Sequence, residues 1–124
     1  MRNSPAHRVA TRWLRGHGPG IGFHVSKSKN ESAISHKGFK PDSAGRRYFW
    51  DTYAMANWFA QFQNDDRSPM TIYKVRLDGL PLKKDTETDD MGEWGSSFER
   101  GYDGGGWFTT SPVGPERIMD KSRT

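Results

Sequence analysis

Four short strands are predicted in this chain, and alternating apolar and polar positions mark two of them, at 22–26 and 70–77. The four fall at residues 22–26, 47–50, 70–77 and 107–110. The alternation is most regular over the third segment, where Tyr73 and Val75 share one face while Lys74 and Arg76 occupy the other. A period of two residues is typical of a strand with one buried face. We therefore expect a small sheet with its apolar side covered by other elements.

A short helix is predicted between the first two strands. Ser28 and Glu31 have the spacing of a capping box, in which the two side chains satisfy main-chain N–H groups at a helix start. Gly38 stands where a helix often ends on a left-handed residue, and Pro41 follows it.

A second helix is predicted after the second strand. Asp51 or Thr52 can cap its start, and it would run to about residue 63. Met55, Phe59 and Phe62 form one apolar stripe at helical spacing.

Loops and a turn account for the remaining segments. The acidic stretch 83–93 is predicted to be a solvated loop. Residues 112–118 are expected to turn so that Val113 and Ile118 return to the core, and the end of the chain from Lys121 is expected to be frayed. The predicted organisation is a basic flexible arm at 1–20, a domain at 21–118 and a tail at 119–124. The fold class is α+β.

Composition indicates one domain with an aromatic core. The 124 residues include 40 apolar ones, of which 16 are aromatic and only 12 are Ile, Leu or Val. Each aromatic side chain can bury roughly 150–250 Å², so rings rather than aliphatic chains must form most of the core. We expect the arm at 1–20 to be dispensable for folding.

Several classes of protein are excluded by what the sequence lacks. It has no apolar run of 18 residues and no apolar stretch after the basic N-terminus, so neither a membrane span nor a signal peptide is expected, and we expect a cytoplasmic protein with no membrane partner. It has no cysteine, no GxxxxGK[ST], no HExxH and no GxSxG. Thiol, phosphate-loop, zinc-protease and serine-hydrolase chemistry are therefore not expected, nor is a metal site.

Charge is distributed unevenly along the chain. Residues 1–50 contain ten Lys or Arg and two Asp or Glu, whereas residues 51–124 contain nine and 13. A basic half of this kind favours an anionic partner such as a nucleotide or nucleic acid, although a solvated surface remains the alternative.

The order of short motifs resembles the opening of the ADP-ribosyltransferase-like fold. His24-Val25-Ser26, a helix and then Gly38-Phe39-Lys40-Pro41 are similar to its first strand, helix and Gly-Leu-x-Pro sequence. Arg47-Tyr48-Phe49-Trp50 resembles its second strand, and Ala56-Asn57-Trp58 resembles the Ala-Asn-Tyr of poly-ADP-ribose polymerases. The segments 71–80 and 106–118 resemble later strands of RNA 2′-phosphotransferases and related transferases. The resemblance covers residues 21–118 and implies a split β-sheet with short flanking helices.

This resemblance implies NAD as substrate and a set of residues that would bind it. His24 would bond the nicotinamide-side ribose, and the main chain of Val25, with Ser26 beside it, would meet the carboxamide. Tyr48 would line the same cleft, and Trp58 or Tyr53 would stack on the nicotinamide ring. Arg46 and Arg47 would clamp the pyrophosphate. Each of these residues also has a purely structural alternative: core packing for the rings, and a solvated strand edge for the arginines.

The sequence departs from the family at the catalytic carboxylate. Transferases of the His-Tyr-Glu type carry it at the start of a late strand, and here that position holds Gly105, Gly106 or Trp107. We expect His24, Tyr48 and Glu99 to be the catalytic residues. Glu99, or alternatively Asp103, could reach the cleft from the preceding loop.

Three functions stay open at this point. The first is transfer of ADP-ribose to a macromolecular acceptor, protein or nucleic acid, by a monomer. The second is an RNA 2′-phosphotransferase, which uses His and arginines without that Glu; its extra N-terminal lobe has no room in this chain. The third is a non-catalytic module that binds an NAD-derived nucleotide or a nucleic acid.

Overall fold

The computed structural model describes residues 18–62, 64, 66–85 and 105–124. Within these ranges the elements follow one another as β1 (Ile21–Lys27), η1 (Ser28–Asn30), α2 (Glu31–Lys37), β2 (Arg47–Trp50), α3 (Tyr53–Phe62), β3 (Met70–Arg76), β4 (Lys83–Lys84), β5 (Gly106–Thr109), η3 (Pro115–Arg117) and β6 (Ile118–Arg123). The α+β class predicted from the sequence is confirmed.

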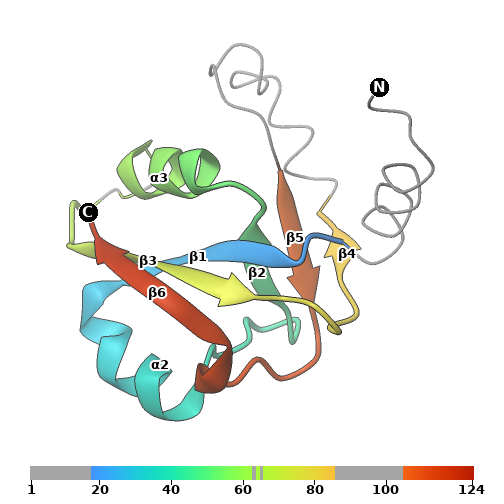
Figure 1. Ribbon diagram of the computed structural model, residues 1–124. Coiled ribbons are helices and arrows are strands. Elements are labelled where there is room, and N and C mark those ends of the chain that lie inside the picture. Colours follow the sequence, from blue (N-terminus) through green and yellow to red (C-terminus); the bar gives the residue numbers. More distant parts are fainter. Residues whose placement is uncertain (1–17, 63, 65, 86–104) are drawn as a thin grey trace.

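The strands form one six-stranded antiparallel sheet with two arms. Its order is β4-β5-β2-β1-β3-β6. One arm contains β1, β3 and β6, the other contains β2, β5 and β4, and the strands of the two arms cross steeply in Figure 1. β1 is paired with β3 along its whole length from Ile21 to Lys27, but with β2 only at Phe23 and Trp50. The junction between the arms is therefore a single pair of residues.

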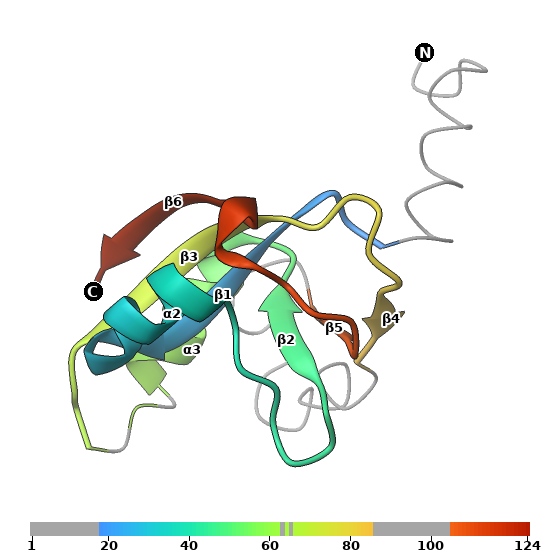
Figure 2. The same cartoon turned by 90° about the horizontal axis from the view of Figure 1, so that it is seen from below.

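Helices α2 and α3 lie on opposite faces of the β1–β3 arm, as Figures 1 and 2 both show. The side chain of Thr52 accepts a hydrogen bond from the Met55 main-chain N–H (3.2 Å), which caps the start of α3 as predicted. Met55 is completely buried, whereas Phe62 is 65% exposed, so the predicted apolar stripe faces the sheet only over its first part.

The core lies mainly on the α2 side of the sheet and is rich in rings, as the composition predicts. Phe39, Phe49 and Tyr73 pack edge to face with centroids 5.5–5.7 Å apart. Val113 is 2% exposed and returns to this core as predicted.

Gly38 ends α2 in a conformation that only glycine can adopt there. Its φ is 80°, and a Cβ on it would lie 2.2 Å from the Val113 carbonyl oxygen. This close approach lets the Phe39 N–H bond to that same oxygen (3.0 Å), which ties the end of the helix to the 112–118 turn.

The capping box predicted at Ser28 and Glu31 does not form. No side chain caps η1 or α2; instead Ser28 Oγ and the Glu31 carboxylate both bond to the buried hydroxyl of Thr71 at 2.7 Å. Arg123 on β6 also donates to both oxygens of Glu31, at 2.8 and 3.1 Å. The charged Arg123 on β6 and the Thr71 hydroxyl on β3 bond to the Glu31 carboxylate in place of the local N–H group that a capping box would use.

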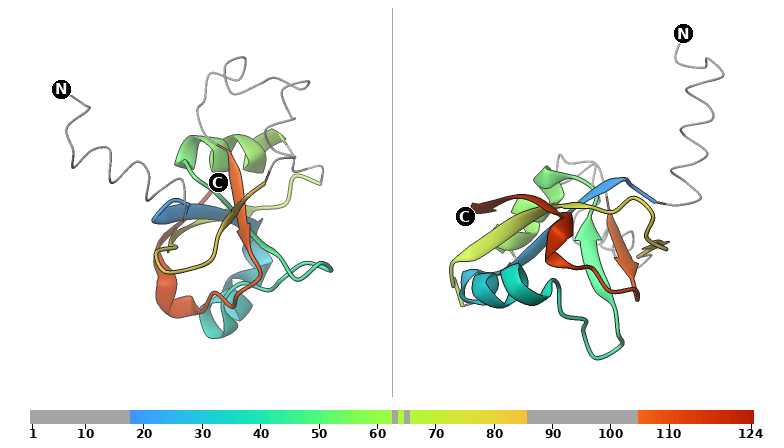
Figure 3. Two further views of the ribbon diagram at one scale, coloured as in Figure 1. Left: turned by 90° about the vertical axis from the view of Figure 1, so that its right-hand side faces the viewer. Right: turned by 60° about the horizontal axis from the view of Figure 1, so that its bottom comes forward.

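The end of the chain is a strand rather than the frayed tail expected from the sequence. Ile118–Arg123 pairs antiparallel with β3 from Val75 to Thr71, with an irregularity at Lys74/Val75. The right-hand view in Figure 3 shows β6 and β4 at opposite ends of the sheet. The expected domain limit at residue 118 is therefore too early.

The start of the fold also extends beyond the predicted limit. Gly18 is buried against Leu82 and Trp107, and the Gly20 carbonyl accepts a 2.7 Å bond from the Leu77 N–H. Residues 18–20, assigned to the arm, thus belong to the fold, while residues 1–17 lie outside the described part. No helix in the described ranges is long and apolar enough to cross a membrane.

Candidate functional site

The imidazole of His24 bridges the junction between the two arms of the sheet. Its Nδ1 lies 2.8 Å from the main-chain oxygen of Tyr48 on β2. The ring packs at 4.6 Å from the Phe39 ring and 5.7 Å from the Phe49 ring, both centroid distances. The main-chain pairing of β1 with β2 is limited to Phe23 and Trp50, and the His24 side chain supplies a further hydrogen bond between the two strands where they separate.

The bond to Tyr48 fixes the tautomer of His24. A carbonyl oxygen can only accept, so Nδ1 must carry the hydrogen and Nε2 has a free lone pair when the ring is neutral. Burial lowers the pKa of His24 below its usual value, and the hydrogen bond to Tyr48 offsets part of this effect. The lowered pKa favours the neutral ring, in which Nε2 is the hydrogen-bond acceptor.

A cavity of about 320 Å³ opens beside this junction, a size at the lower end of the roughly 300–1,000 Å³ usual for small-molecule sites. Its wall contains residues of β1, β2, α3 and β5 and the residue after β4: His24, Val25, Tyr48, Phe49, Trp50, Phe59, Asp85 and Gly106. The rings of Trp50 and Phe59 pack with centroids 5.5 Å apart. The cavity therefore offers flat apolar surfaces next to one imidazole and one carboxylate.

Three residues expected from the sequence meet here, while both expected stacking residues lie elsewhere. His24, Val25 and Tyr48 line the cavity. Trp58 does not line it and packs its ring 5.9 Å from Phe62; Tyr53 is 46% exposed and contacts Phe23.

The cavity uses Phe59, the residue after Trp58. A step of one residue turns a helical side chain by about 100°, so only one of these two rings can face the sheet. The sequence could have identified Phe59, because it lies on the same apolar stripe as Met55, which faces the sheet.

The two candidate arginines have different surroundings. The Arg46 guanidinium lies 4.6 Å from the centroid of the Phe108 ring and donates to the Tyr48 hydroxyl over 3.4 Å, which places its charge next to a cavity residue. Arg47 donates to the Phe39 carbonyl at 2.7 Å and to the Ser111 carbonyl at 3.2 Å. Arg47 therefore holds two loops together.

Within the described part of the chain, no other residue expected at the site lines the cavity. Ser26 does not line it and accepts a 3.1 Å bond from the Asn30 amide. Glu99 and Asp103 lie outside the described residues.

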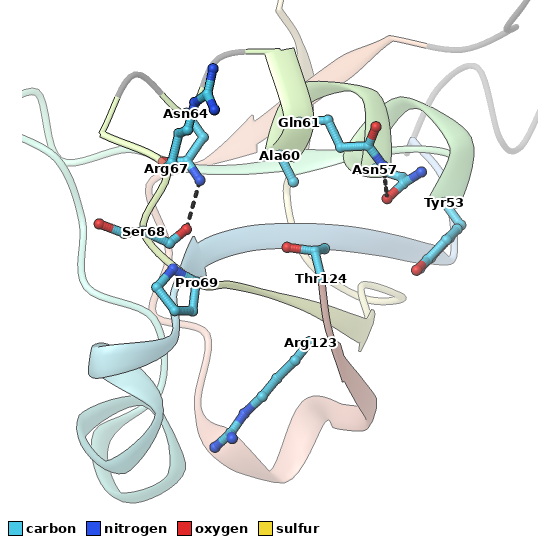
Figure 4. A pocket seen from close by; sticks show the side chains of 10 residues that line it. All are labelled: Tyr53, Asn57, Ala60, Gln61, Asn64, Arg67, Ser68, Pro69, Arg123 and Thr124. Atoms are coloured by element: carbon cyan, nitrogen blue, oxygen red, sulfur yellow. Dashed lines mark hydrogen bonds between the residues drawn. The ribbon is translucent and has the colours of Figure 1, made fainter.

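A second, polar groove of about 640 Å³ lies between α3 and the end of β6 (Figure 4). Its amide groups are already bonded: Gln61 donates to Asn57 (3.2 Å), and Asn64 donates to the Ser68 carbonyl (2.6 Å). Tyr53 is the expected site residue that lines it. The groove is larger than the cavity but lacks its convergence of rings, imidazole and carboxylate.

The described residues contain no group of three His, Asp or Glu that could hold a metal ion. Comparison of the sequence with models of known families and with curated proteins found no match. The function must therefore be inferred from the cavity and from the motifs that line it.

Proposed function

We propose that this protein binds NAD in the cavity at the β1–β2 junction and transfers ADP-ribose to a macromolecular acceptor, within a small ADP-ribosyltransferase-like fold. The observation that carries the proposal is the convergence of His24, Val25 and Tyr48 on one cavity. These are the residues that the resemblance assigns to the nicotinamide side of NAD, and they come from two strands 20 residues apart in sequence.

The cavity suits the nicotinamide end of NAD for physical reasons. The pyridinium ring is flat and cationic, and the rings of Trp50, Phe59 and Tyr48 provide aromatic surfaces that attract such a ring. The Nε2 of His24 would accept a hydrogen bond from a ribose hydroxyl. Arg46, beside Tyr48, would pair with the pyrophosphate at the cavity rim.

The chemical step would be displacement at the ribose C1′. The bond from C1′ to the nicotinamide nitrogen breaks, and its electron pair leaves with neutral nicotinamide. A nucleophile of the acceptor then bonds to C1′, and its proton passes to a base. Positive charge develops on the ribose during this step, so a nearby carboxylate would accelerate it.

A non-catalytic NAD-binding module is the second candidate. It is favoured by one observation. The resembling transferases carry a carboxylate at the start of this strand, whereas β5 begins with Gly106, preceded by Gly105. The phosphotransferase alternative loses support because Arg47 is bonded to main-chain carbonyls.

Calorimetry with NAD tests the proposal, with two phenylalanines of α3 as a matched pair. Phe59→Leu removes an aromatic wall of the cavity, while Phe62→Leu changes a ring that is 65% exposed on the same helix. We expect Phe59→Leu to weaken NAD binding about tenfold and Phe62→Leu to leave it within about twofold. Equal affinities for the two variants, or no NAD binding by the wild type, would remove the cavity from consideration. Release of nicotinamide separates the transferase from the module.

A further inference from the structure

One carboxylate belongs to the cavity wall among the described residues, and it comes from an unexpected strand. Asp85 immediately follows β4 and lines the cavity with His24 and Tyr48. Its main-chain N–H donates to the Gly106 carbonyl over 2.9 Å. Asp85 is thus fixed beside the β5 position that lacks a side chain.

The pairing of β4 with β5 explains why the Asp85 side chain belongs to this face. Lys84 pairs with Trp107, and its ammonium lies 5.2 Å from the centroid of the Trp107 ring. Successive residues of a strand alternate between faces, so Asp85 is on the opposite side from Lys84. Gly106, directly across from Asp85, has no side chain to occupy the intervening space.

The other carboxylate near the start of β5 is committed to holding the chain. Asp51 accepts from the Gly105 N–H at 2.8 Å and from the indole N–H of Trp107 at 3.2 Å. It positions β5 and does not line the cavity. Asp85, unlike Asp51, lines the cavity.

We infer that Asp85 is the catalytic carboxylate of the proposed transferase, supplied by the strand next to the one that carries it in the resembling enzymes. This inference rests on the proposed function. The Asp85 carboxylate would face the C1′ region of the bound nicotinamide ribose and stabilise the positive charge that appears as the bond to nicotinamide breaks. When water is the acceptor, its oxygen bonds to C1′ and its proton goes to Asp85 and then to solvent.

The test measures nicotinamide release from NAD in water by the full chain, together with NAD affinity by calorimetry. Asp85→Asn keeps the main-chain bond to Gly106 and removes the negative charge. We expect it to lower the release rate about 100- to 1,000-fold while NAD affinity changes less than about threefold, because the interaction is made mainly in the transition state. Asp85→Glu, which restores a carboxylate, should retain more activity than Asp85→Asn.

Asp78→Asn is the matched control, since Asp78 is an exposed residue paired with Arg76 and does not line the cavity. It should leave both measurements unchanged, and a thermal melt of each variant confirms that it is folded. A wild type that binds NAD but releases no nicotinamide overturns the inference and leaves the binding module. Normal release by Asp85→Asn, or loss of release on Glu99→Gln or Asp103→Asn alone, also overturns it while the proposed function stands. Absence of NAD binding overturns both.

Discussion

The Nδ1–H of His24 donates to the main-chain oxygen of Tyr48 over 2.8 Å, across the point where β1 and β2 separate. These two strands share only the pair Phe23 and Trp50, so the imidazole supplies the next connection between the arms of the sheet. One ring nitrogen therefore has a structural role, and the other is left to accept a hydrogen bond from a ligand. The two roles of His24 can be separated by substitution.

His24→Leu should be less stable than His24→Asn. Leucine leaves the half-buried Tyr48 carbonyl without this donor, whereas the Asn amide can donate from nearly the position of Nδ1. We expect a difference of about 1–2 kcal/mol in the free energy of unfolding, measured with urea. Both variants should lose NAD affinity, because neither has Nε2. Equal stability of the two variants would show that the bond to Tyr48 contributes nothing.

Arg46 and Arg47 should give opposite results when each is replaced by Met. Arg47→Met removes bonds to the Phe39 and Ser111 carbonyls, so it should cost about 1–3 kcal/mol of stability and leave NAD affinity nearly unchanged. Arg46→Met should weaken NAD binding and make it less sensitive to salt, because a positive charge beside the cavity residue Tyr48 is lost. Urea unfolding and calorimetry at two salt concentrations measure these effects. The expected clamp of both arginines predicts instead that both variants lose affinity.

Glu31 should contribute to the loss of stability in acid. Hydrogen bonds from Arg123, then from Thr71, lower the pKa of Glu31 from 4.5 to about 2. Because the folded carboxylate binds a proton less readily than the unfolded one, its stabilisation is complete above pH 4.5 and is lost as the pH falls toward 2. Urea unfolding at a series of pH values should show a flatter profile for Glu31→Gln than for wild type. Glu116→Gln, at an exposed residue of η3, should keep the wild-type profile.

Truncations of the N-terminus should locate the true start of the fold. A chain that begins at Gly18 keeps the contacts of that glycine with Leu82 and Trp107, and should melt at the wild-type temperature. A chain that begins at Ile21 loses the Gly20 carbonyl and leaves the buried Leu77 N–H without its acceptor. We expect a cost of about 1–3 kcal/mol for the second truncation. Identical melting of both chains would restore the limit at residue 21.

The sequence by itself determined the elements whose residues carry a local pattern. The alternation of Tyr73 and Val75 with Lys74 and Arg76 specified β3, because a period of two has one structural explanation. Gly38 marked the end of α2, because few other residues tolerate its backbone conformation. The abundance of rings predicted a core built around Phe39, Phe49 and Tyr73. The same local motifs, His24-Val25-Ser26 and the strand containing Tyr48, also named three residues of the cavity.

Only the tertiary structure decided the features that depend on a distant partner. β6 has little alternation and most of its side chains are exposed, so its strand conformation comes from the open edge of β3 and cannot be read from its own residues. Glu31 does not form a capping box, because its carboxylate accepts hydrogen bonds from Arg123 and Thr71, which are far away in sequence. Asp85 lies in a stretch that reads as a solvated acidic loop, and it reaches the cavity because β4 pairs with β5. Local patterns report periodicity and backbone preference, whereas a site is made by the register between strands, which no short segment contains.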